Sequence, residues 1–121
     1  MHLVHTSADG QLAVVGVMLN EGQANAALAP VFDNMPAVAG PEQPVAVSVH
    51  PEAFFPAART TYRCMGSLTT PPCTEGIHWN LFTEPVEVSA AQIAAFRALF
   101  PNNARPPQGV NEREVVEDTT G

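Results

Sequence analysis

The amino-acid sequence predicts a mainly β protein with short helices, an α+β fold. Apolar runs typical of strands recur from the N-terminus to Phe82, whereas only two segments place apolar residues at helical spacing. Hydrophobic residues make up 45% of the 121 residues and charged residues 14%, which is enough apolar material for a core. A chain of this length forms one domain at most.

The strand signals lie in the N-terminal and middle parts of the chain. Residues 1–4 are strand-like, and a polar turn follows at residues 6–10. Residues 12–19 are apolar on both alternating faces, so they predict a central strand that is covered on both sides. Two more strands are predicted at residues 61–65 and 76–82, and a weak alternation at residues 45–49 allows another.

Two helices are predicted from spacing and end signals. Apolar residues recur at helical spacing in residues 25–35, and Pro36 ends this helix. Ser89 and Gln92 match a capping box, in which the serine caps the helix start and the glutamine reaches back. Pro101 ends this second helix.

The charge of the chain excludes some classes of partner. The net charge is -7, and the five basic residues are all arginines without a cluster. Such a surface cannot attract nucleic acid or an anionic lipid surface, so we expect neither as a partner. No apolar run of about 18 residues and no signal-peptide pattern is present, so we expect no membrane span. The acidic residues 112–121 predict an extended, partly solvated tail.

His2 and His5 are the first candidate metal ligands. A strand sends residues three apart to opposite faces, so only one of the two can bind a given ion. A histidine in an apolar strand also has an alternative role as a hydrogen-bonded core residue, which the residues alone leave open.

The segment of residues 66–79 contains a second candidate site. Small and hydroxyl-bearing residues, among them Thr69 and Thr70, are followed by Pro71 and Pro72. Two prolines make such a loop rigid, and rigid hydroxyl groups can orient a bound water or anion without rearrangement. The alternative is a tight proline turn whose threonines bond only their own backbone.

Residues 66–79 resemble the signature loop and strand of the α-carbonic anhydrases, and residues 1–5 resemble the strand that carries this family's third zinc histidine. Residues 12–19, 84–89 and 103–111 agree with the same family in order and spacing, so the resemblance covers nearly the whole chain. It implies the C-terminal part of the large twisted, mostly antiparallel sheet of these enzymes.

The resemblance also implies roles for individual residues. His2 is then the zinc ligand, and His5 is a buried structural histidine on the opposite face. Thr69 accepts a hydrogen bond from zinc-bound hydroxide and orients it, and Thr70 contacts bicarbonate. The apolar wall that holds carbon dioxide comprises Val4, Val14, Leu68, Ile77 and Trp79. Without the resemblance, these apolar residues would be assigned to core packing.

The function implied is the zinc-dependent reversible hydration of carbon dioxide to bicarbonate and a proton. Family members are longer, and the part without a counterpart here carries the other zinc histidines as a His-x-His pair, for which His50 and His78 are no substitute. We therefore expect residues 1–121 to be a partial domain that lacks its N-terminal half and is inactive alone. An acatalytic carbonic-anhydrase-related binding module and a non-functional truncated product are the alternatives.

The two cysteines, Cys64 and Cys73, could form a disulfide, bind metal or stay reduced. Pro71 and Pro72 make a bridge between them geometrically doubtful. By the resemblance, Cys73 stands where bacterial and secreted relatives form a disulfide with an N-terminal cysteine. This implies a bacterial-type, periplasmic or secreted parent protein.

Overall fold

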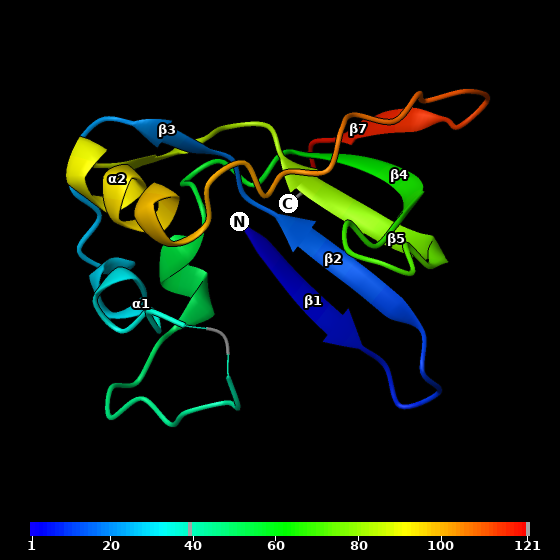
Figure 1. The fold of residues 1–121 in the computed structure, drawn as a ribbon. Helices are drawn as coiled ribbons and strands as arrows, with labels where there is room; N and C mark the ends of the chain where they lie inside the picture. Colours follow the sequence, from blue (N-terminus) through cyan, green and yellow to red (C-terminus); the bar gives the residue numbers. More distant parts are fainter. Residues whose placement is uncertain (39, 121) are drawn as a thin grey trace. The chain divides into compact units, whose positions relative to one another are not determined.

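The structure is a computed structural model that describes residues 1–38 and 40–120. The described residues form two compact units. The first unit comprises residues 1–18, 56–85 and 104–120, and the second comprises residues 19–38, 40–55 and 86–103. Figure 1 shows the strands and helices of both units along the chain.

A five-stranded sheet forms the first unit, in the order β1-β2-β5-β4-β7. Its strands are β1 (His2–Thr6), β2 (Leu12–Gly16), β4 (Thr61–Ser67), β5 (Glu75–Phe82) and β7 (Val115–Asp118). Antiparallel pairing joins β1 to β2, β5 to β4 and β4 to β7, whereas β2 and β5 run parallel. Strand β2 therefore lies between two neighbours, which confirms that this segment is central.

The prediction of one strand over residues 12–19 was too long. Strand β2 ends at Gly16, and a separate strand, β3 (Leu19–Glu21), begins after it in the second unit. The core of the first unit includes Val14, Val17, Ile77 and Phe82, each no more than 6% exposed. Burial alternates along β2, as expected from the two-residue period of a strand. On β5 the two buried residues, Ile77 and Phe82, lie on opposite faces.

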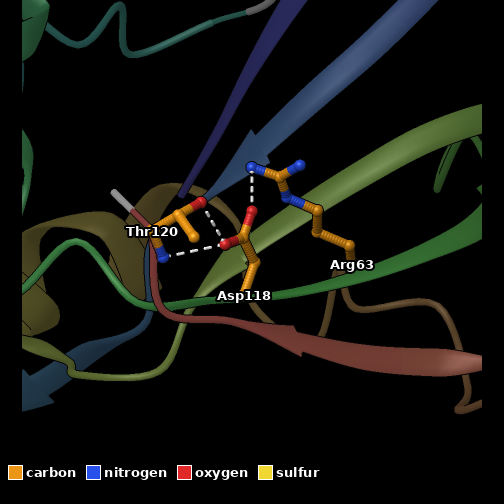
Figure 2. A network of polar contacts seen from close by, with 3 residues as sticks. All are labelled: Arg63, Asp118 and Thr120. Carbon is orange, nitrogen blue, oxygen red and sulfur yellow. Dashed lines mark hydrogen bonds and ion pairs between the residues drawn. The ribbon is translucent and has the colours of Figure 1, made fainter.

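Residues 112–121 were predicted to form an extended, partly solvated tail, and within them β7 is a strand whose residues are mostly exposed. Strand β7 pairs with β4, so this part of the tail belongs to the sheet. Figure 2 shows that Arg63 forms an ion pair with Asp118, which also accepts hydrogen bonds from the backbone and side chain of Thr120. Gly121, the last residue of the predicted tail, lies outside the described residues. The pairing with β4 was not predicted, because an acidic composition does not reveal a partner strand that lies far away in sequence.

We expect the pairing of β7 to depend on pH through the carboxylate of Asp118. Hydrogen bonds from Thr120, assisted by the charge of Arg63, lower the pKa of Asp118 below its ordinary value of 3.8. A lowered folded pKa means that this contribution to stability is present above the unfolded pKa and is lost as pH falls through the folded pKa. We expect the backbone amide resonances of β7 to move toward random-coil positions as the pH falls below about 4.

An Asp118→Asn variant is expected to show part of this shift already at neutral pH, as measured by NMR. Asp9→Asn is the matched control, because the pKa of Asp9 is also lowered but its partners Ser7 and Gln11 lie in the turn after β1. If the β7 resonances change neither with pH nor with the Asp118 substitution, the contacts of Asp118 with Arg63 and Thr120 do not stabilise this strand.

The second unit contains strands β3 and β6 (Val86–Val88) as a parallel pair. Its helices are α1 (Ala29–Asp33), α2 (Ala90–Leu99) and a 3-10 helix, η1 (Pro51–Phe54). Side chains of Leu28, Phe54 and Val88 are its most buried apolar groups. None of the helices within the described ranges is long and apolar enough to cross a membrane.

Local signals predicted one helix of this unit well and the other poorly. The capping box of Ser89 and Gln92 is present at the start of α2, as predicted. Helix α1 is shorter than the predicted 25–35, because the side chain of Asn25 accepts the backbone N–H of Leu28 in a turn before the helix. Residues 45–49 were wrongly allowed as a strand: they pair with no strand among the described residues, and their valines are 38–45% exposed.

Candidate functional site

The strand register places the side chains of His2 and Trp79 on the same face of the sheet. Val4 pairs with Val14, and Val14 pairs with Trp79. Paired residues share a face and neighbours along a strand alternate, so this face carries both His2 and Ile77 as well. We call it the histidine face: His2, Val4, Val14, Ile77 and Trp79. Strand alternation thus collects on one surface five residues that the sequence singled out.

His2 and Trp79 are in direct contact on the histidine face. Their ring centroids lie 4.8 Å apart and the rings are nearly perpendicular, at 86°. Edge-to-face packing is a preferred geometry for aromatic rings. Partial burial, followed by the positive charge of the Met1 ammonium, lowers the pKa of His2 below its ordinary value. The shift favours the neutral imidazole, which is the form that binds a metal ion, although the residue as a whole remains exposed.

Trp79 connects this histidine to the hydroxyl-bearing loop. Its indole Nε1 donates a hydrogen bond to the carbonyl oxygen of Ser67, 3.0 Å away. Ser67 closes β4 at a bulge, where Gly76 is the extra residue on β5 and has a positive φ of 80°. A bulge with glycine in this conformation bends the strand and redirects the following side chains. The bulge therefore lies where the chain leaves the sheet for the threonine loop.

The loop after Ser67 is closed by its own backbone. The N–H of Leu68 donates to Thr74 O at 2.9 Å, and the N–H of Cys73 donates to Thr70 O at 2.8 Å. The peptide bond between Pro71 and Pro72 is cis. These contacts fix both ends of a tight turn that presents Thr69 and Thr70 to solvent.

The predicted site residues differ in how deeply they lie. Val14 and Ile77 are buried, at 1% and 2% exposure, and Val4 is 57% exposed. Leu68 and Trp79 are half-buried, whereas His2, Thr69 and Thr70 are exposed. Within the described part of the chain no hydrogen bond joins either threonine to His2, and their connection runs through Ser67 and Trp79.

The two other histidines near the sheet lie away from this face. His5 lies three residues after His2 and His78 lies next to Trp79, so both alternate to the opposite face. His5 was predicted to be buried, and this is wrong for the chain as described: it is exposed, with Nδ1 3.0 Å from Leu3 O. The reason is that β1 is an edge of the described sheet.

Gly66, Ser67 and Arg105 were not among the predicted site residues. Arg105 Nη1 donates to Ser67 Oγ at 3.1 Å and lies 3.5 Å from Leu68 O, so it ties a distant segment to the start of the loop. A cavity of about 320 Å³ borders this contact and is lined in part by Ser67, Glu75 and Arg105. Arg105 can be seen in the sequence beside Pro106, but the sequence does not reveal that its hydrogen-bond partner is Ser67.

The donor set does not by itself suit a catalytic zinc ion. No three His, Cys, Asp or Glu side chains in residues 1–38 and 40–120 come together in a way that could hold a metal. A catalytic zinc site takes three protein ligands, and here His2 offers one. Both cysteines, Cys64 and Cys73, are free thiols, so no local bridge forms between them.

A family model and curated relatives each match nearly the whole chain. The model of the eukaryotic-type carbonic anhydrase family matches residues 4–119. The chain is 42% identical over 118 residues to a carbonic anhydrase of Nostoc sp. (strain PCC 7120 / SAG 25.82 / UTEX 2576), which covers 97% of this chain and 45% of that protein. It is 40% identical over 116 residues to a carbonic anhydrase of Pectobacterium carotovorum, covering 95% and 48%. The chain spans about half the length of these curated relatives.

Solved structures agree with the fold. The α-carbonic anhydrase of Thermovibrio ammonificans in complex with sulfanilamide is 41% identical, with a TM-score of 0.89 over 94% of this chain and 51% of that chain. Dioscorin complexed with ascorbate is 34% identical, with a TM-score of 0.80 over 96% of this chain and 51% of that chain. These similarities confirm the prediction of a mainly β fold with short helices.

Proposed function

Because the chain belongs to the eukaryotic-type carbonic anhydrase family, we propose that it contributes to a domain that hydrates carbon dioxide reversibly to bicarbonate and a proton, with Zn²⁺ as the cofactor. Zinc-dependent hydration of carbon dioxide is the general activity of this family. The contact of His2 with Trp79, on the face that also carries Val4 and Val14, is the observation that supports the proposal most directly.

Each candidate residue has a role in this proposal. His2 supplies one imidazole ligand to the zinc ion. Thr69 accepts a hydrogen bond from the attacking oxygen and orients it, since a hydroxyl on a closed turn needs no rearrangement when charge develops. Thr70 contacts bicarbonate. The apolar wall for carbon dioxide comprises Val4, Val14, Leu68, Ile77 and Trp79. An uncharged substrate suits such a wall because it requires few hydrogen bonds.

We also propose that residues 1–121 are part of one domain and act together with the other half of it, since the relatives are about twice as long. That half would bring the remaining zinc histidines. The chain alone should then bind zinc weakly and be inactive, because one histidine replaces a three-ligand site. A periplasmic or secreted parent protein is proposed from the resemblance around Cys73 alone.

A hybrid domain tests this function. The part of the Nostoc relative that the chain does not cover would be joined to residues 1–121, and carbon dioxide hydration would be followed by stopped-flow with a pH indicator. We expect the hybrid to bind one zinc ion per chain and to hydrate carbon dioxide, and residues 1–121 alone to do neither. A folded, zinc-loaded hybrid without hydration activity would contradict the proposed function.

A further inference from the structure

The indole of Trp79 on β5 lies close to one glycine on each neighbouring strand, Gly66 on β4 and Gly16 on β2. On β4, Gly66 pairs with Ile77, and on β2, Gly16 pairs with Leu81, so these glycines flank the pairing of Trp79 with Val14 and Cys64. A large ring can lie close to a sheet only where neighbouring positions lack bulk. The space above Gly66 and Gly16 is therefore a candidate determinant of where Trp79 lies.

Space, and not backbone conformation, is what requires glycine at position 66. Its φ is not in the left-handed region, so other residues could adopt its backbone conformation. A methyl group on Gly66 would lie 2.9 Å from Cδ1 and 3.1 Å from Nε1 of Trp79, and 3.5 Å from Nη1 of Arg113. The first two distances are too short, and the atoms belong to a rigid ring whose Nε1 is already bonded to Ser67 O.

Gly16 provides an internal comparison. A methyl group there would lie 2.8 Å from Leu81 Cδ1, which is the end of a flexible side chain, and 3.6 Å from Trp79 Cζ3, which is an ordinary contact. Leu81 can rotate away, whereas any shift of the rigid indole at Gly66 also moves its Nε1 relative to Ser67 O. The two glycines thus differ in what an alanine would displace.

We infer that Gly66 is a positioning residue for His2: by having no side chain, it lets the indole of Trp79 lie at the place where it packs against the His2 ring. An alanine at position 66 pushes the indole away from β4, and the edge-to-face contact with His2 changes as a result. The consequence for metal binding rests on the proposed function, in which His2 is a ligand. Metal ligands must be held to within about 0.5 Å by the residues packed around them.

Trp79 is the only tryptophan of the chain, so its fluorescence and near-UV circular dichroism report this ring alone. We expect Gly66→Ala to shift the emission to longer wavelength and to reduce the near-UV signal. Gly16→Ala is expected to change both signals less. Gly40→Ala should leave them unchanged, because a methyl group there meets no atom within 4 Å.

The position of His2 is read separately by NMR at fixed pH. The ring current of the indole shifts the imidazole proton resonances of His2 at a centroid distance of 4.8 Å. We expect Gly66→Ala to shift these resonances and to leave those of His50, which is exposed, unchanged. Unchanged His2 resonances together with unchanged Trp79 fluorescence in Gly66→Ala would overturn the inference.

A double variant covers the case in which Gly66→Ala does not fold. Replacing Trp79 by alanine removes both ring atoms that the methyl group would meet. If that contact is the cause, adding Gly66→Ala to Trp79→Ala should leave the far-UV circular dichroism of the Trp79→Ala protein unchanged; unfolding of the double variant alone would overturn the inference. None of these measurements needs zinc or substrate, so an inactive hybrid domain leaves them standing, and their failure leaves the hydration test unaffected.

Discussion

Replacing His2 by alanine is expected to abolish carbon dioxide hydration in the hybrid domain. In the proposed site His2 supplies one of three zinc ligands, and its partial burial lowers its pKa and so favours the neutral form. Losing a ligand should cost more than the roughly 10- to 100-fold in metal affinity or activity that loss of an outer partner costs. Zinc content by mass spectrometry and stopped-flow hydration measure the two effects.

His50→Ala is the matched control for His2→Ala. His50 lies before η1 in the second unit, is exposed, and makes no side-chain capping hydrogen bond to that helix. We expect this variant to keep its zinc and its activity. If His2→Ala retains full zinc content and activity while the control behaves normally, His2 is not a metal ligand and the site assignment fails.

Replacing Trp79 by alanine is expected to destabilise the first unit by about 2–3 kcal/mol. Fully buried Phe or Trp to Ala substitutions cost about 3–5 kcal/mol, and the half-buried position of Trp79 places it below that range. The change removes the contact with His2 and the hydrogen bond to Ser67 O, which alone is worth about 1 kcal/mol. Urea unfolding followed by far-UV circular dichroism measures the loss without needing the tryptophan.

Trp79→Phe separates the two parts of this effect. It keeps a ring against His2 but loses the N–H donor, so a cost of about 1–1.5 kcal/mol is expected. Val38→Ala is the surface control, because Val38 is 78% exposed and such substitutions stay within about 0.5 kcal/mol. A cost for Trp79→Ala no larger than for Val38→Ala would mean that the ring does not hold this part of the sheet together.

Alternation along strands made part of the site predictable. In a strand the side-chain period is two residues, so the sequence alone separates His2 and Val4 from Leu3 and His5, and Ile77 and Trp79 from His78. The pairing of β1 with β2 and of β2 with β5 then brings these residues together on one face of the sheet. Which residues share a face is therefore a local property, fixed before any long-range contact forms.

Contacts between distant segments were not predictable in the same way. The bond from Trp79 to Ser67 and the bond from Arg105 to Ser67 join residues that are far apart in sequence. The exposure of His5 depends on which strand forms the sheet edge. A single sequence carries no period or end signal for such pairs, because they depend on how separate elements meet.

Local chemistry determined the start of α2, the strand character of β4 and β5, and the faces of the histidines, because caps and alternation act over a few residues. Only the tertiary structure decided that residues 115–118 pair as β7 while residues 45–49 pair with no described strand. Strands are stabilised by partners that lie far away in the chain, so the alternating residues 45–49 remain a loop while residues 115–118, which do not alternate, form a strand.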